Sequence, residues 1–346
     1  MPSWIRGSAT GTKWPDVADF EDHSQFRDPT EPVAPPVPVA DGGPADIVIG
    51  DVETFAGKGR TLRADAIRRL RRNKLAMAGL VWIIIVIIIA VTADLWVPYW
   101  LGDPIQIDST TVAQEDLLPP SWPEHPFGTD ELGRDVASRV IYGARVSLVV
   151  GIVAVFIMVV IGLVLGAISA YYGGLADSFI MRTADVFFAF PYILFAIALI
   201  AVLGRGFQNV FIAIGFLGWP SIARVFRSSI LGIKKNEYVD AARAMGASTP
   251  RLLARHIMPN SIAPIIVYAT MSIGGAILTE AALSFLGMGV QPPAPSWGLM
   301  LSEARSFMFT APWLMIWPGL AILTTVLAFV LLGDGLRDAL DVKLKE

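Results

Sequence analysis

Residues 146–176 read VSLVVGIVAVFIMVVIGLVLGAISAYYGGLA and contain no charged side chain. A helix rises about 1.5 Å per residue, so this segment is longer than the hydrocarbon layer of a bilayer, which is about 30 Å thick. Gly162, Gly166 and Ala170 repeat at four-residue spacing, which is typical of helices that pack closely inside a membrane. The segment predicts a spanning helix that packs against other helices.

Further uncharged segments occur on both sides of this helix. They are residues 75–93, 186–204, 206–223, 257–279 and 306–333. The segment 206–223 is the weakest, because it contains Gln208, Asn209 and Pro220. We therefore expect an all-α, polytopic membrane protein with six transmembrane helices. Without residues 206–223 the chain would have five spans, and its C-terminal half would be inverted.

The distribution of basic residues predicts the orientation of these spans. Residues 60–74 and 224–255 carry seven Lys and Arg each, whereas residues 94–145 carry three against nine carboxylates. Because short cytoplasmic loops are rich in Lys and Arg, both termini are expected in the cytoplasm. The expected outside loops are 94–145 and 280–305, and the expected inside loops are 177–185 and 224–256. Six spans agree with this bias, and five do not.

The composition excludes several classes of protein. The chain has 346 residues, of which 54% are hydrophobic and 16% charged, and its mean hydropathy is +0.58, which argues against a water-soluble globule. It has no cysteine and three histidines, His23, His125 and His256. Disulfides and thiolate nucleophiles are therefore excluded, and we expect neither catalytic residues nor a metal site. The first apolar run begins near Leu75, too late for a cleavable secretory signal.

The N-terminal part divides into two segments before the first span. Residues 1–59 hold eight of the 24 prolines and show no hydrophobic periodicity, which predicts a disordered cytoplasmic tail. Residues 60–74 combine their basic side chains with one apolar face and predict a basic amphipathic juxtamembrane helix on the lipid surface. A solvated linker helix is the alternative. The first span, residues 75–93, follows directly.

The predicted cytoplasmic segment 224–256 is long for a connection between spans, which indicates a structured element. Residues 237–259 read EYVDAARAMGASTPRLLARHIMP. Glu237 and Asp240 suit the first turn of a helix, and Gly246 suits its end. A second short helix is expected between Gly246 and the next span. The small side chains of Ala241 and Ala242, together with Gly246, would let another protein approach one side of the first helix closely.

The spacing inside this segment resembles the EAA loop of ABC-importer permeases. Asp240-Ala241-Ala242 is followed after three intervening residues by Gly246, and Pro259 lies thirteen residues further on. In that family the loop forms a coupling helix that seats in a cleft of a separate ATPase subunit. The resemblance implies an ATPase-coupling role for Glu237, Asp240, Ala241, Ala242, Arg243, Gly246, Arg255, His256 and Pro259.

Three positions depart from the general pattern of that loop. Asp240 stands in place of Glu and keeps the charge, and Met258 stands in place of Leu and keeps the volume. His256 occupies a usually aliphatic position. Arg255-His256 before an aliphatic-x-Pro-Asn run is similar to the peptide and nickel branch of the family.

A second block resembles the same branch. Residues 125–147 read HPFGTDELGRDVASRVIYGARVS, similar to the segment before the second span in C-type permeases of dipeptide, oligopeptide and nickel importers. EAALSFLG at 280–287, PSWG at 295–298 and LLGDGLRD at 331–338 are further matches. The matches extend from about residue 65 to 342, and residues 146–342 are expected to form the permease core.

The block at 125–147 also predicts local structure in the external loop. Thr129 is expected to cap an interfacial helix with one apolar face. His125, Asp130 and Asp135 are read as capping and ion-pairing residues. The alternative is that they bind a metal, which a single histidine beside a proline-rich flank disfavours.

Glu280 lies at the outer end of the fifth predicted span, where a carboxylate is costly unless it faces water or a partner. It is a candidate for the transport pathway or a subunit interface, and snorkelling to the outer surface is the alternative.

Several functions compete for a chain of this kind. A secondary transporter would need ionisable groups at mid-membrane, and none of the six predicted spans carries a charge. An intramembrane enzyme would need a nucleophile with a base or several metal ligands, and no histidine falls inside a span. A structural scaffold would not explain the cytoplasmic loop. No Gly-x-x-x-x-Gly-Lys-Ser/Thr loop occurs in the sequence, so ATP would be hydrolysed by another polypeptide.

The resemblance implies an assembly around this chain. It implies a type I permease fold in the bacterial inner membrane, paired with a homologous second permease and with two ATPase subunits that bind ATP and Mg²⁺. An extracytoplasmic substrate-binding protein and membrane lipid complete the expected partners, and no nucleic acid is expected. The chain itself is expected to bind no cofactor. Peptides are the expected substrate, with nickel or another small solute as the alternative.

Overall fold

The computed structural model describes residues 62–105 and 116–340. The tail predicted at 1–59 lies outside the described residues, as do the first two residues of the basic segment 60–74. Within the described ranges the secondary structure is helical apart from two isolated bridges, Ser121 with His125 and Thr129 with Asp135. The predicted all-α class is confirmed.

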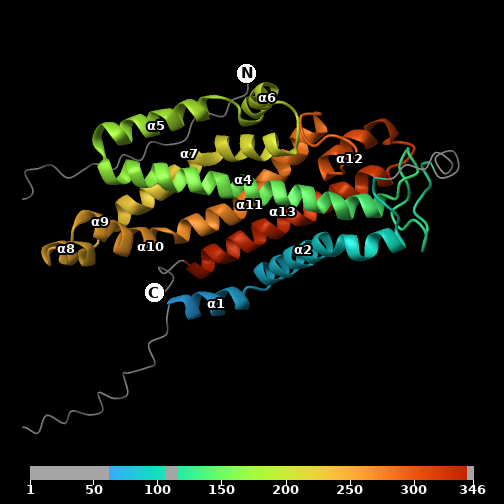
Figure 1. Ribbon diagram of the computed structural model, residues 1–346. Coiled ribbons are helices and arrows are strands. Elements are labelled where there is room, and N and C mark those ends of the chain that lie inside the picture. Colours follow the sequence, from blue (N-terminus) through green and yellow to red (C-terminus); the bar gives the residue numbers. More distant parts are fainter. Residues whose placement is uncertain (1–61, 106–115, 341–346) are drawn as a thin grey trace, which may run out of the picture. The chain divides into compact units, whose positions relative to one another are not determined.

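The helices have the following bounds (Figure 1). They are α1 (Leu62–Arg72), α2 (Lys74–Trp100), α4 (Val136–Tyr172), α5 (Gly174–Ala189), α6 (Tyr192–Leu203), α7 (Phe207–Ile233), α8 (Glu237–Ala244), α9 (Thr249–Leu252), the π-helical turn η3 (Leu253–Ile257), α10 (Met258–Ser261), α11 (Ala263–Phe285), α12 (Trp297–Glu303), the 3₁₀ turn η4 (Ala304–Phe307) and α13 (Trp313–Leu340).

Five of the described helices are long and apolar enough to cross a membrane: α2, α4, α7, α11 and α13. A sixth candidate is the pair α5 and α6, which is bent by 95°. The break falls at Phe190 and Pro191, where proline cannot continue the hydrogen-bond ladder of α5. The predicted third span, 186–204, is therefore not one straight helix. Residues 177–185, predicted as a loop on the inside, instead form part of the helix α5.

The packing of α4 against α7 shows that the bent pair must cross the membrane. A Cβ added to Gly162 of α4 would lie 2.4 Å from Ile222 Cβ, and one added to Gly166 would lie 2.8 Å from the Ala223 carbonyl oxygen. Nearer the start of both helices, a Cβ at Gly215 would lie 2.7 Å from the Ala154 carbonyl. The residue numbers rise together, so α4 and α7 are parallel, and the chain between them has to return across the bilayer. The five long helices and the bent pair together agree with the predicted total of six spans.

The small-residue stripe of α4 is the contact surface that its spacing predicts. Side chains larger than glycine at Gly162 or Gly166 would prevent the approach of α7. The segment 206–223, the weakest span in the sequence, becomes part of α7, whose central residues are largely buried against its neighbours.

The N-terminal helix contacts the end of the last span. A Cβ added to Gly335 of α13 would lie 3.3 Å from Leu70 Cδ1 of α1 and 2.2 Å from Ala76 Cβ of α2. The Asn73 side chain accepts a hydrogen bond from the Ala76 N–H and caps α2. The C-terminal end of α13 and the helix α1 therefore lie at the same end of the bundle (Figure 1).

The expected interfacial helix in the loop 94–145 is not a separate element. Asp135, rather than Thr129, is the cap, because its Oδ1 accepts a hydrogen bond of 2.8 Å from the Ser138 N–H. The helix that starts at Val136 is α4 itself, which continues without a break into the span. Thr129 Oγ1 instead accepts a hydrogen bond from the Leu118 N–H and fixes a turn. The apolar spacing after Thr129 thus marks the first turns of a long helix.

Candidate functional site

The segment predicted to couple to another protein begins with α8, an exposed helix at the end of the bundle opposite α12 (Figure 1). Glu237 and Asp240 occupy its first turn, where carboxylates interact favourably with the helix dipole. Asp240 also forms an ion pair of 2.8 Å with Arg243. Because Glu237, Asp240 and Arg243 are all exposed, they contribute little to the stability of the chain and remain accessible to a partner.

The two faces of α8 differ. Val239 and Ala242 are buried against the chain itself, and Val239 belongs to a cluster that contains Ile230 and Ile257. The expectation that Ala242 offers an open, low-bulk surface to a partner is wrong, because Ala242 is buried within this chain. Ala241 is exposed.

Apolar side chains also stand on the free surface of this segment. Met245 is 82% exposed and Tyr238 is 44% exposed. Both apolar side chains stand beside the exposed charges of α8.

Gly246 ends α8 as the sequence predicts. Its φ is +86°, in the left-handed region that favours glycine. Its N–H donates to the Arg243 carbonyl, and the Ala247 N–H donates to the Ala242 carbonyl, so the last carbonyls of the helix are satisfied. No other atom of the chain lies within 4 Å of the position that a Cβ would occupy. The glycine is required by the backbone conformation and not by crowding within this chain.

The second half of the segment returns to the membrane through a π-helical turn. Arg255 and His256 lie in η3, and Pro259 lies in the short helix α10. Because Pro259 has no N–H, it cannot donate to the Arg255 carbonyl, and the wider turn stands directly before it. Arg255 and Pro259 are exposed, and His256 is partly buried. The Asn260 side chain donates to the His256 carbonyl at 2.6 Å, which holds this turn in place.

Glu280 lies near the end of the fifth span, as its position in the sequence predicts, but its side chain does not reach a surface. Its side chain is 0% exposed, inside the chain, near the end of α11. Ser147 of α4 donates to its Oε2 at 3.0 Å, and Ser284 donates to its Oε1 at 2.7 Å. The prediction of a pathway or interface carboxylate, and its alternative of snorkelling, are both wrong for this structure. Glu280 instead joins α4 to α11, because hydroxyl donors satisfy it in the interior.

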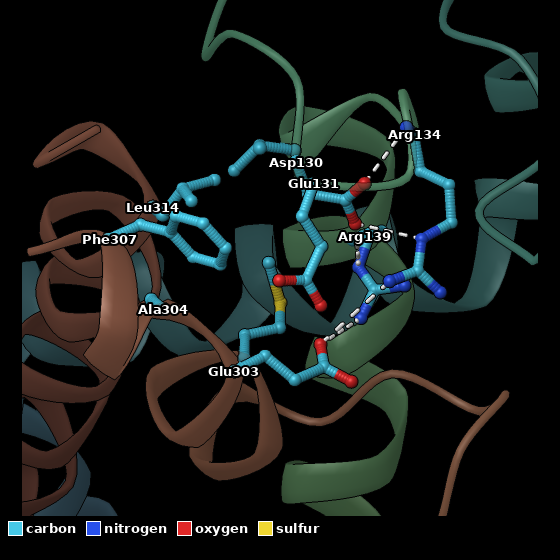
Figure 2. Close-up of a pocket in the computed structure, with 10 residues that line it drawn as sticks. Asp130, Glu131, Arg134, Arg139, Glu303, Ala304, Phe307 and Leu314 are labelled. Atoms are coloured by element: carbon cyan, nitrogen blue, oxygen red, sulfur yellow. Dashed lines mark hydrogen bonds and ion pairs between the residues drawn. The ribbon is translucent and has the colours of Figure 1, made fainter. Parts of the chain in front are cut away.

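A group of charged side chains lies where α4 begins, and we call it the Arg139 cluster (Figure 2). Its members are Asp130, Glu131, Arg134, Arg139 and Glu303. Arg139 is 2% exposed, and its Nη2 donates to Glu303 Oε2 at 2.7 Å. Arg134 Nε donates to Asp130 Oδ2 at 2.8 Å, and Arg139 Nε lies 3.4 Å from the same oxygen. The cluster joins α4 to α12, on the side of the pocket opposite Phe307 and Leu314 (Figure 2).

Two carboxyls in this region have perturbed pKa values. Burial, followed by the nearby carboxylates of Glu303 and Asp130, raises the pKa of Glu131. Burial also raises the pKa of Asp135, although hydrogen bonds from the Ser138 N–H and from His125 act in the opposite direction. His125 Nδ1 lies 3.1 Å from Asp135 Oδ2.

These contacts agree with the capping and ion-pairing roles predicted for His125, Asp130 and Asp135. Among residues 62–105 and 116–340 no three His, Asp or Glu side chains are grouped so that they could hold a metal ion. The pairing of Arg139 with Glu303 was missed, because partners 164 positions apart leave no spacing signal in one sequence.

Comparison with known proteins adds an independent finding. The model of the family "Binding-protein-dependent transport system inner membrane component" matches residues 158–346, and that of "N-terminal TM domain of oligopeptide transport permease C" matches residues 61–120. The chain is 45% identical to the dipeptide transport system permease protein DppC of Alkalihalophilus pseudofirmus, over 81% of this chain and 90% of that protein. It is 48% identical to the glutathione transport system permease protein GsiD of Escherichia coli, over 80% and 89%.

Among solved structures, a chain of the MetNI methionine ABC transporter in an inward-facing conformation is similar. The TM-score is 0.49 and the sequence identity 20%, over 58% of this chain and 96% of that one.

Proposed function

The chain belongs to the binding-protein-dependent inner-membrane components of ABC importers, in the dipeptide and oligopeptide branch, and from that premise we propose that it forms half of the path by which short peptides enter the cell. It is a multi-pass inner-membrane protein with the type I permease fold. The observation that supports a peptide substrate is the 45–48% identity to permeases of dipeptides and of glutathione over four fifths of the chain. Glutathione is itself a peptide.

The partners follow from the same premise. We infer a homologous second permease, two ATPase subunits that bind ATP and Mg²⁺, and an extracytoplasmic binding protein that delivers the peptide. The sequence lacks a phosphate-binding loop, which supports hydrolysis in a separate subunit. The chain would then perform no covalent chemistry and bind no cofactor. Its contribution is to alternate between outward-open and inward-open arrangements.

The coupling to ATP is proposed for residues 237–259. The exposed charges of Glu237, Asp240 and Arg243, with Tyr238 and Met245 beside them, form a compact docking surface at one end of the helix bundle. The opposite face of α8 is packed through Val239 onto the cluster of α7 and η3. A force applied to α8 by a closing ATPase dimer would therefore pass directly into α7 and α11 as a rigid-body displacement.

Reconstitution of the complete transporter tests this function. Proteoliposomes that contain both permeases and the ATPase subunits, with binding protein outside, are expected to accumulate a labelled dipeptide or tripeptide only with ATP. The chain purified alone should neither bind nor hydrolyse ATP. Uptake of Ni²⁺ without uptake of peptides would contradict the peptide assignment, and peptide uptake driven by an ion gradient without ATP would contradict the whole proposal.

A further inference from the structure

Two hollows lie along one side of α7 and α11. The first has a volume of about 220 Å³, and the second, of about 430 Å³, includes Arg224, Ser228 and Pro264. The hydroxyl groups that line them belong to Tyr192, Ser221, Ser228, Ser229, Tyr268, Ser272 and Thr279. Hydroxyl groups that face an open hollow are uncommon at membrane depth, because lipid offers no hydrogen bonds.

The positions on each helix place both hollows on the same faces. On α7 the lining residues include Gly218, Ser221, Val225 and Ser228, and on α11 they include Pro264, Tyr268, Ser272, Gly275 and Thr279. Steps of three and four residues keep side chains on one side of a helix. The hollows therefore follow each other along one strip, which we call the hydroxyl groove.

The hydroxyl groove is polar but uncharged over the length of the first hollow. Ser272 donates to the Tyr268 carbonyl at 2.7 Å, and Thr279 donates to the Gly275 carbonyl at 2.8 Å. These two hydroxyl protons are thus used within α11, and the lone pairs of the two oxygens remain available as acceptors. The hollow between α11 and α13 is different, because it is lined by side chains such as Leu278, Leu323 and Val326, which suit lipid.

Charge is found only at the end of the groove nearer α8. Arg224 lines the second hollow and forms an ion pair with Asp185 of α5. A molecule in the groove would meet neutral acceptors first and a guanidinium close to the α8 end. Peptide amides are donors that match such acceptors, and a peptide carboxylate matches the guanidinium.

We propose that the hydroxyl groove is this chain's wall of the translocation path, and that it holds an extended short peptide through hydrogen bonds from the peptide amides to the hydroxyl oxygens of α11. This inference rests on the proposed function. It assigns selection to the peptide backbone rather than to side-chain charge, because the first hollow carries no charged residue.

Gly275 gives a direct test. A Cβ there meets no atom of the chain within 4 Å, so Gly275→Leu places a side chain in the groove without a clash at its Cβ. Gly319 of α13 is the matched control, because it is equally open but lines the apolar hollow. In the reconstituted transporter, Gly275→Leu should lower peptide uptake by about tenfold or more, with assembly and ATPase activity kept. Gly319→Leu should transport like the parent.

Two outcomes of this comparison overturn the inference. Normal uptake by Gly275→Leu would mean that the groove is not on the path. Loss of the second permease on co-purification of Gly275→Leu would mean that a helix of that subunit, not substrate, fills the groove.

Cysteine accessibility keeps the inference separate from the substrate assignment. The chain has no native cysteine, so Ser272→Cys and Thr270→Cys can be compared directly. Thr270 shares the helix, its depth and its hydrogen bond to the residue four positions earlier, but it lies on the other side of α11. A small hydrophilic thiosulfonate should modify position 272 at least tenfold faster than 270 in the assembled transporter. Equal rates would contradict a groove open to water, whatever the substrate is.

Transported peptide should protect position 272 from this reagent if the proposed function is correct. A different result is that position 272 reacts fast, no peptide protects it and the parent transporter takes up no peptide. That result would support a groove open to water but contradict the peptide substrate.

Discussion

At the scale of single residues, Gly246 shows how one backbone angle shapes the docking surface. At its φ of +86° a residue with a Cβ is strained by about 1 kcal/mol, and a β-branched residue by more. A substitution at Gly246 would therefore strain the turn that follows α8 and directs Met245 outward. Since nothing in the chain crowds Gly246, any steric effect of a side chain there would be exerted on a partner.

The variant Gly246→Val tests this role. We expect the spans to remain inserted and the chain to lose about 1–2 kcal/mol of stability, because valine is β-branched, while ATPase docking and ATP-driven uptake fail. Co-purification of the ATPase and uptake, at matched membrane abundance, measure the effect. Gly232→Val is the control, because Gly232 is equally open but lies in α7 without a positive φ. Normal docking by Gly246→Val would remove the coupling assignment from residues 237–259.

Glu131 links the stability of the Arg139 cluster to pH. Its raised pKa means that the folded chain holds this proton more tightly than the unfolded chain does. The associated stability is therefore full below the unfolded pKa, near 4.5, and is lost as the pH rises through the raised value. Glu131→Gln should raise the melting temperature at pH 7, and the gain should shrink as the pH falls toward 4. A gain that stayed constant over this range would show that ionisation of Glu131 is not its cause.

At the scale of elements, the sequence predicts best where one physical rule dominates. Apolar length locates the spans, and the four-residue spacing of Gly162 and Gly166 identifies the contact of α4 with α7. The end of α8 at Gly246 follows from glycine's freedom at positive φ. Local rules of this kind need no knowledge of the rest of the fold.

Prediction fails where distant residues decide. The burial of Ala242 depends on which face of α8 packs against the rest of the chain, and the burial of Glu280 depends on Ser147 of another helix. Neither is visible in local spacing. The start of α4 was also misplaced, because the Asp135 cap and the apolar periodicity after Thr129 resemble the signals of a separate helix. The hydroxyl groove has a local signal, the steps of three and four residues along α11, but that signal becomes meaningful only when α7 is placed beside it.

The ion pair between Arg139 and Glu303 should couple α4 to α12 energetically. Removing one partner of this partly buried pair leaves the other charge less well compensated, and Arg139→Met should cost about 1–3 kcal/mol. The double variant Arg139→Met, Glu303→Leu should cost less than the two single variants together, with a coupling of about 0.5–3 kcal/mol. Thermal unfolding in detergent of the four proteins measures this. Strict additivity would show that the contact of 2.7 Å contributes no net energy.

At the scale of the whole molecule, two packing contacts restrict the topology. Parallel α4 and α7 require the bent pair α5 and α6 to cross the bilayer. The contact of α1 with the last turns of α13 requires an even number of crossings between them, which six spans satisfy and five do not. Both conclusions hold whichever side of the membrane the ends occupy.

The distribution of charge then selects the side. Seven basic residues at 60–74 and seven at 224–255 favour the cytoplasm for α1 and α8, and the carboxylate-rich residues 94–145 favour the exterior. The absence of cysteine from the chain allows a direct measurement in intact cells. Glu124→Cys, at an exposed position, should react with an impermeant maleimide, whereas Lys235→Cys, exposed beside α8, should react only after the membrane is opened. The reverse labelling pattern would show that the orientation is inverted and that α8 faces the exterior. A cytoplasmic ATPase could not then contact α8, so the proposed coupling mechanism would be wrong as well.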